Sequence, residues 1–153
     1  VERRLKQRQL VRWRLRRRFL VRRRKQWRGR RLLGRRFADE LLGMGTILEM
    51  NASEAMALAG EAEVGAAARR LHGVTRQPVV VTLGKEGTLC HSAAGGLHVP
   101  TRPVKPVDTI GAGDAHTAGF LSALAQGKTL REACAAANDT AAIVVQHTGC
   151  SME

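Results

Sequence analysis

The sequence contains no tyrosine, and its aromatic residues are only three phenylalanines and two tryptophans. A core built from it must therefore be packed mainly with aliphatic side chains. The three cysteines, Cys90, Cys134 and Cys150, are an odd number without a C-x-x-C spacing, which argues against a disulfide framework and a zinc site. No uncharged apolar run approaches the ~20 residues that span a bilayer. We therefore expect neither a disulfide-stabilised secreted protein nor a membrane protein, but a cytoplasmic one.

Acidic residues are scarce in the first quarter of the chain. Residues 1–37 contain 18 Lys and Arg residues but a single acid, Glu2, which gives a net charge of +17. Residues 38–153 contain 8 basic and 12 acidic residues, which gives −4. The total of +13 therefore describes two parts of opposite sign, an Arg-rich arm (1–37) and a body (38–153).

Three interpretations of the arm remain open. Dense like charges repel one another, which favours a solvated, disordered segment or a marginal helix. Sixteen arginines, with Trp13 and Trp27 between them, also suit binding to the backbone of a nucleic acid, and the body would then be a scaffold. A GC-rich coding region translated in the wrong frame would also yield abundant arginine, and the arm would then be non-native.

The body alternates between patterns typical of strands and of helices. The run 79–83 is continuous and β-branched, as in a strand buried on both faces. Alternating strands and helices indicate an α/β layer fold. The patterns predict strands at 46–50, 79–83, 88–92 and 97–99, an extended stretch at 104–107, and helices at 53–71, 112–126 and 130–145.

The segment from Asp108 to Asp114 follows the extended stretch and begins a helix. Its small residues Gly111, Ala112 and Gly113 allow backbone N–H groups to converge on an anion at the helix N-terminus, where the helix dipole is favourable. Asp114, in the first turn, could accept the proton of a hydroxyl that attacks a phosphoryl group. The alternative is an ordinary glycine-rich helix start with an Asp that complements the dipole.

The full string Asp-Thr-Ile-Gly-Ala-Gly-Asp resembles the C-terminal signature of the ribokinase-like (PfkB) family of sugar and nucleoside kinases. The resemblance covers about residues 38–152. Asn51-x-x-Glu54 is similar to a family motif linked to magnesium and phosphate, and the string from Thr82 to Gly87 is similar to one that lines the nucleotide site. The resemblance implies that the ATP-binding residues are Asn51, Thr82, Gly84, Gly87 and Asn138, the last near the adenine.

The resemblance also implies the fold and the activity. The body would be the C-terminal portion of a three-layer αβα fold with a mostly parallel sheet. ATP would phosphorylate a hydroxymethyl group of a small-molecule sugar or nucleoside, with Asp114 as the base, Gly111–Gly113 as the anion hole and Glu54 acting through Mg²⁺. A homodimer is one option for the oligomeric state. A monovalent cation such as K⁺ would involve Asp108 and the carbonyls around Ile110, Val144, His147 and Gly149.

Each of these motifs has a structural alternative. Asn51-x-x-Glu54 is also a helix capping box, the string 82–87 is also an ordinary glycine turn, and Asn138 could lie on a helix surface. His116 stands where Phe is the commoner family residue, and it could tune the pocket or merely pack.

The arm does not resemble the N-terminal half of the family, which carries a Gly-Gly substrate motif and a lid. We therefore expect little kinase activity from this chain alone. An inactive truncated remnant is the remaining alternative.

Overall fold

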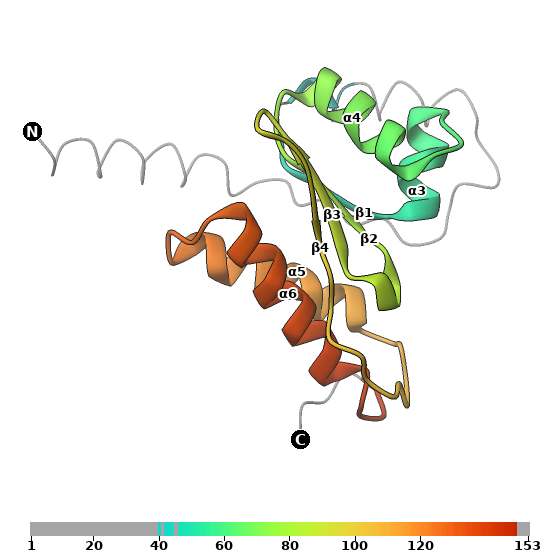
Figure 1. The fold of residues 1–153 in the computed structure, drawn as a ribbon, viewed down its shortest axis with the longest axis vertical. Coiled ribbons are helices and arrows are strands. Elements are labelled where there is room, and N and C mark those ends of the chain that lie inside the picture. The colour runs from blue at the N-terminus through green and yellow to red at the C-terminus, as the bar shows by residue number, and fades with distance from the viewer. Residues whose placement is uncertain (1–39, 41, 45, 150–153) are drawn as a thin grey trace, which may run out of the picture.

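The computed structural model describes residues 40, 42–44 and 46–149, so the Arg-rich arm and Cys150 lie outside the described residues. Within that part, four strands form one sheet in the order β1-β2-β3-β4. Helices α3 and α4 cover one face of this sheet, and α5 and α6 cover the other (Figure 1). The elements are β1 (Leu48–Asn51), α3 (Ala52–Ala59), α4 (Val64–Thr75), β2 (Val79–Thr82), β3 (Thr88–Ser92), β4 (Gly95–Val99), α5 (Ala112–Ala125) and α6 (Leu130–Val144).

Strand β2 divides the core into two clusters. Val79 and Val81 pack toward α3 and α4, whereas Val80, between them, packs toward α5 and α6. This division follows from the two-residue period of a strand, which sends successive side chains to opposite faces. All three valines have 0% exposure, so the prediction of a strand buried on both faces is confirmed. The second cluster contains Phe120 among small residues such as Cys134.

The sheet is mixed rather than mostly parallel. Strands β1 and β2 pair in parallel, but β2 with β3 and β3 with β4 pair antiparallel. The lengths of the connections explain the difference, because a parallel pair needs a long crossover and a short connection forces an antiparallel turn. Helices α3 and α4 supply the crossover, whereas the 3₁₀ helix η1 (Gly84–Glu86) and residues 93–94 make the short connections. The α/β class holds, but the predicted strand direction is wrong for this part of the sheet.

The single helix predicted at 53–71 is two helices. Gly60 lies in the left-handed conformation, with φ of 68°, and ends α3 by donating its N–H to Met56 O at 2.8 Å. A residue without Cβ adopts this conformation at little cost, and it is the usual way for a helix to stop. The alanine-rich pattern continues across Gly60, which is why periodicity alone joined the two helices.

The stretch 104–107 belongs to no strand of the described part. Instead, Val107 and Asp108 donate their N–H groups to Val145 O at 2.7 and 3.2 Å, just beyond the end of α6. The segment that leads into α5 is thereby joined to the end of α6.

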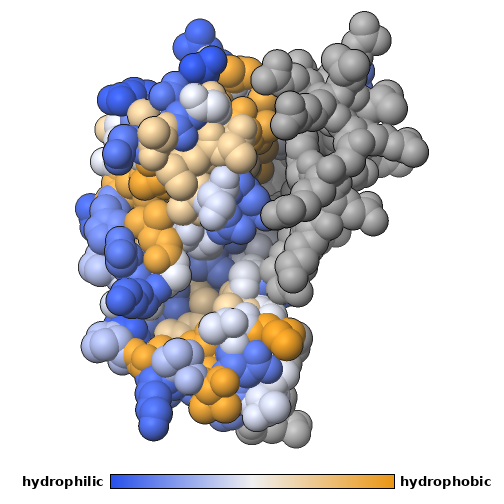
Figure 2. All heavy atoms as spheres, turned by 90° about the vertical axis from the view of Figure 1, so that its right-hand side faces the viewer, coloured by the Kyte–Doolittle hydropathy of each residue, from blue (hydrophilic) through white to orange (hydrophobic). Residues whose placement is uncertain are grey.

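The surface of the described part has no single apolar face in the view of Figure 2, where apolar and hydrophilic side chains are interspersed. Three exposed large hydrophobic residues, Val107, Ile110 and Ile143, flank the start of α5 or the end of α6 in the sequence. Among the described helices, none is long and apolar enough to cross a membrane.

Candidate active site

The glycine-rich segment forms the beginning of α5, as predicted. Gly111 is the N-cap residue and adopts the left-handed conformation, with φ of 83°. Gly111 has no side chain that could cap the first turn, so the N–H groups there are left to other partners. Asp114 lies in this turn and is exposed. The arrangement is therefore an open helix N-terminus with a carboxylate beside it.

The end of α6 lies against the residues that precede α5. Asp108 Oδ1 accepts the N–H of Ile110 at 2.9 Å, and Asp108 Oδ2 accepts the N–H of Gly149 at 2.9 Å. Val144 O accepts the N–H of His147 at 3.2 Å. The structure thus brings the segments 108–110 and 144–149 together, as the expected cation group requires. Both Asp108 oxygens already accept N–H groups, however, so a role in holding a cation stays a prediction.

The hydrogen bonds from Ile110, Gly149 and Thr109 hold the pKa of Asp108 below its ordinary value. A lowered pKa in the folded state means that the ionised carboxylate stabilises the fold above the ordinary pKa, and that this contribution is lost as pH falls through the lowered value.

We therefore expect the wild-type chain to lose stability relative to Asp108→Asn on acidification below about pH 4, and to be the more stable of the two above it. Urea midpoints measured against pH test this expectation, with Asp139→Asn, at an exposed position of α6, as the control. Parallel curves for the wild type and Asp108→Asn would contradict it.

Asn51 and Glu54 form a capping box where β1 leads into α3. Glu54 Oε2 accepts the N–H of Asn51 at 3.0 Å, and Asn51 Oδ1 accepts the N–H of Glu54 at 2.9 Å. The two hydrogen bonds therefore confirm that Asn51 and Glu54 form a helix capping box. The Glu54 carboxylate is exposed and keeps lone pairs for a hydrated cation, so the magnesium assignment remains compatible with it.

The string 82–87 forms a tight loop between β2 and β3. Leu83 donates its N–H to Gly87 O at 2.8 Å, and Gly84 and Gly87 have positive φ of 63° and 92°. A Cβ on Gly87 would lie 2.2 Å from Val99 O, so no other residue fits without displacing the end of β4. Thr82 pairs with Asn51 at the ends of the parallel strands. Ligands of open α/β sheets bind at this edge.

Asn138 is buried, with 5% exposure, so the surface alternative is wrong. Its Oδ1 accepts the hydroxyl proton of Thr88 at 2.7 Å, and its Nδ2 donates to Val99 O at 2.9 Å. The side chain therefore ties α6 to the start of β3 and the end of β4. Its assignment to the adenine side of a nucleotide site stays a prediction.

His116 packs in the core, with 3% exposure, but it is also the centre of a polar chain. Its Nε2 lies 2.7 Å from Thr88 Oγ1, and its Nδ1 lies 2.8 Å from Glu49 Oε1. Thr117 Oγ1 is 2.9 Å from the same Glu49 oxygen. The sequence patterns did not single out Glu49, Thr88 or Thr117. For Glu49 a signal was available, because it is an acidic residue between Leu48 and Met50 in a segment predicted to be a buried strand.

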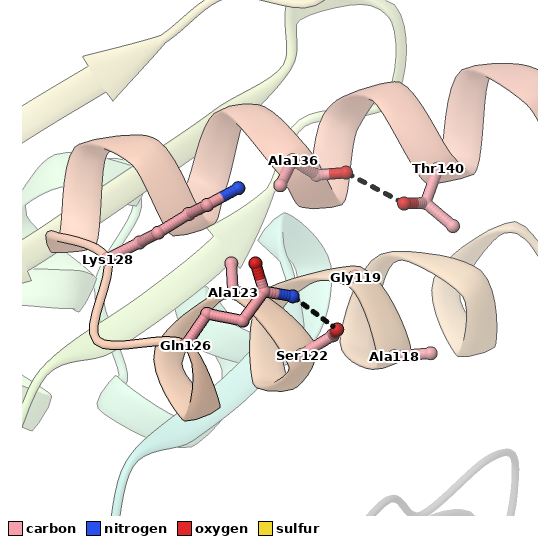
Figure 3. A pocket seen from close by; sticks show the side chains of 8 residues that line it. All are labelled: Ala118, Gly119, Ser122, Ala123, Gln126, Lys128, Ala136 and Thr140. Carbon is pink, nitrogen blue, oxygen red and sulfur yellow. Dashed lines mark hydrogen bonds between the residues drawn. The ribbon is translucent and has the colours of Figure 1, made fainter.

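A pocket lies between α5 and α6 (Figure 3). Within it, Gln126 Nε2 donates to Ser122 Oγ at 3.2 Å and Thr140 Oγ1 donates to Ala136 O at 2.8 Å. Gly119 lets the helices approach closely, since a Cβ there would lie 2.6 Å from Thr140 Oγ1. None of the candidate site residues lines this pocket.

Among the described residues, no group of three or more His, Cys, Asp or Glu could hold a metal ion.

The layers and the glycine-rich start of α5 define a three-layer α/β protein of the ribokinase-like fold. A family model described as "pfkB family carbohydrate kinase" matches residues 30–153, so it begins within the arm that composition defines. The chain belongs to the pfkB family of carbohydrate kinases.

Individual relatives are longer than this chain. A protein of Escherichia coli (strain K12) named as the uncharacterized sugar kinase YegV is 43% identical over 72 residues, which are 47% of this chain and 22% of that protein. The cytidine kinase of Thermococcus kodakarensis is 36% identical over 96 residues, which are 61% of this chain and 34% of that protein.

A similar solved structure also belongs to a longer protein. Aminoimidazole riboside kinase from Salmonella enterica, complexed with aminoimidazole riboside and an ATP analog, superposes with a TM-score of 0.72 at 29% identity. The superposition covers 81% of this chain and 43% of that structure. The chain thus spans less than half the length of these relatives.

Proposed function

We propose that the chain is the nucleotide-binding, C-terminal part of a kinase that transfers the γ-phosphoryl group of ATP to a hydroxymethyl group of a sugar or nucleoside. The observation that carries this proposal is the start of α5, where Gly111 leaves the first turn uncapped and Asp114 stands beside it. Backbone N–H groups and the helix dipole favour a phosphate there. A relative solved with an ATP analog supports the choice of nucleotide.

Phosphoryl transfer depends mainly on positioning and charge stabilisation, and different residues of the site would supply each of these. The N–H groups of Gly111–Asp114 would hold the transferring phosphoryl group. The carboxylate of Asp114 would orient the attacking hydroxyl and accept its proton. Helix α5 lies near the nucleotide edge of the sheet, because His116 contacts Thr88, which follows the loop 82–87.

The remaining assignments concern the nucleotide and its cations. Mg²⁺ would neutralise charge on the phosphates, and Glu54 would hold it through water because this carboxylate also caps α3. Asp108 and the carbonyls around it would hold K⁺. The amide of Asn138 is engaged by Thr88 and Val99, so this residue would act on the adenine side by holding the end of β4.

The proposed acceptor class is sugars and nucleosides. The relatives above are named as kinases of a sugar, of cytidine and of aminoimidazole riboside. Cytidine and aminoimidazole riboside both carry a hydroxymethyl group on a ribose ring, and we propose the same group as the acceptor for this chain.

Calorimetric titration of the chain with Mg-ATP tests the nucleotide part of the proposal. We expect Gly113→Pro, which removes an N–H from the second position of α5, to weaken Mg-ATP binding about tenfold or more, because a hydrogen bond to a charged group contributes about 1.5–3 kcal/mol. AMP, which lacks the outer phosphates, should bind both proteins equally. Proline is tolerated in a first turn, so the helix should persist.

Arg131→Pro is the matched control, because Arg131 holds the second position of α6. It should bind Mg-ATP like the wild-type chain. Equal affinity of Gly113→Pro and the wild type for Mg-ATP would contradict phosphate binding at the start of α5.

A further inference from the structure

A buried carboxylate lies next to the first turns of α5. The side chain of Glu49 is 7% exposed and that of His116 is 4% exposed. Glu49 Oε1 contacts His116 Nδ1 at 2.8 Å and Thr117 Oγ1 at 2.9 Å, whereas Oε2 is buried without a hydrogen-bond partner among the described residues. Burying a carboxylate is costly unless it is paired. Proteins accept such local costs mainly at functional sites, which prompts the question of what Glu49 holds.

The hydrogen bonds determine where the protons lie. Asn138 Nδ2 donates to Val99 O, so the Oδ1 of the same amide must accept the single hydroxyl proton of Thr88. Thr88 Oγ1 therefore accepts from His116 Nε2, which must carry a proton. A second proton lies between Nδ1 of His116 and Oε1 of Glu49, because two lone pairs would repel at that distance. The Glu49–His116 pair is thus neutral as a unit and fixed at both ends.

Thr117 connects this pair to the candidate anion hole. Its Oγ1 lies 2.9 Å from Gly113 O as well as 2.9 Å from Glu49 Oε1, and because a hydroxyl carries a single proton, these two acceptors share the proton of Thr117. The carbonyl of Gly113 and the N–H of Asp114 belong to one planar peptide unit. A group that fixes the direction of that carbonyl therefore also fixes the direction of an N–H in the first turn of α5. Glu49 itself stands on β1, two residues before Asn51.

We propose that Glu49 and Thr117 are positioning residues that set the Gly113–Asp114 peptide for phosphate binding, with His116, Thr88 and Asn138 holding the carboxylate in place. This inference rests on the proposed function for the identity of the anion. The geometric part, which is the restraint of the first turn of α5 by a buried carboxylate, stands on the contacts alone.

Thr117→Val tests the link, because valine keeps the shape of threonine and removes the hydroxyl. We expect it to weaken Mg-ATP binding about tenfold, equivalent to about 1.4 kcal/mol, and to leave AMP binding unchanged. Hydrogen exchange of the Ala115 amide, which donates to Gly111 O at 2.9 Å at the start of α5, should become faster, while exchange in α6 should not change. Thr117→Ser, which restores the hydroxyl, should behave as the wild-type chain does.

Thr140→Val provides a matched control. Thr140 Oγ1 donates to Ala136 O at 2.8 Å, the same type of contact within a helix as that of Thr117 Oγ1 with Gly113 O. Among the described residues, none of the hydrogen bonds of Thr140 goes to a carboxylate. It should change neither Mg-ATP binding nor exchange at the start of α5. Glu49→Gln should retain binding, since its amide can donate to His116 Nδ1, whereas Glu49→Ala should lose it.

Each outcome decides a separate question. If Thr117→Val binds Mg-ATP as the wild type does, or leaves exchange at the start of α5 unchanged, the positioning role is overturned. If the wild-type chain binds no Mg-ATP, the proposed function fails. Hydrogen exchange then still decides whether Glu49 and Thr117 restrain the first turn of α5.

Discussion

Replacing Asp114 with alanine should lower the turnover number of a kinase that carries this chain by about 10²–10⁴-fold, the usual contribution of a positioned acid or base. The affinity for Mg-ATP should change by less than about threefold, because the N–H groups that are proposed to bind phosphate are part of the backbone. Asp114 stands in the first turn of α5 and is exposed, and the proposed function requires the acceptor hydroxyl to lie beside it.

A chimaera is a suitable protein for this measurement, since the chain spans 34% of the cytidine kinase of Thermococcus kodakarensis. The N-terminal portion of that enzyme would be joined to this chain, and the unsubstituted chimaera, once shown to phosphorylate cytidine, would be the reference for the variants. Asp139→Ala, which removes an exposed carboxylate from α6, is the matched control and should leave turnover unchanged. Near-normal turnover of the Asp114→Ala protein would show that Asp114 merely complements the helix dipole.

Helices bounded by strong local signals could be predicted from the sequence to within about a residue. Helix α5 begins after Gly111, and α6 begins with a capping box between Thr129 and Glu132. The helix predicted at 53–71 failed because one glycine in the left-handed conformation outweighed an uninterrupted alanine pattern. Strand direction was not visible in the patterns, because it depends on connection length and on pairing between strands.

In the candidate site, too, some residues could be predicted from local sequence and others could not. Gly84 and Gly87 in the loop 82–87 and Gly111 before α5 all have positive φ, which favours glycine, so a local motif reveals them. Glu49 and Thr117 are 68 positions apart, and Thr88 and Asn138 are 50 apart. No local pattern predicts such contacts, which exist only because β1, β3, α5 and α6 pack together. The burial of Asn138 and the polar role of His116 follow from the same packing.

His116→Phe should destabilise the chain by about 3–5 kcal/mol, the usual cost of removing one partner of a buried polar pair and leaving the other unpaired. The substitution takes away the ring nitrogen that contacts Glu49 Oε1 and the N–H that donates to Thr88 Oγ1. Urea denaturation measures the change. His98→Phe is the control, because His98 is an exposed histidine whose Nε2 contacts Glu86 O at 2.8 Å, and we expect it to cost less than about 1 kcal/mol.

A second substitution distinguishes a missing partner from poor packing. Glu49→Leu added to His116→Phe should recover most of the lost stability, because an apolar pair can replace a buried ionic one. A double-mutant cycle measures this coupling, and purely additive effects would contradict it. The recovered protein should still bind Mg-ATP weakly, since Thr117 would have no carboxylate to hold it. If the double variant regains stability but still binds Mg-ATP weakly, Glu49 is needed to position Thr117 and the first turn of α5 and is not needed for the stability of the core.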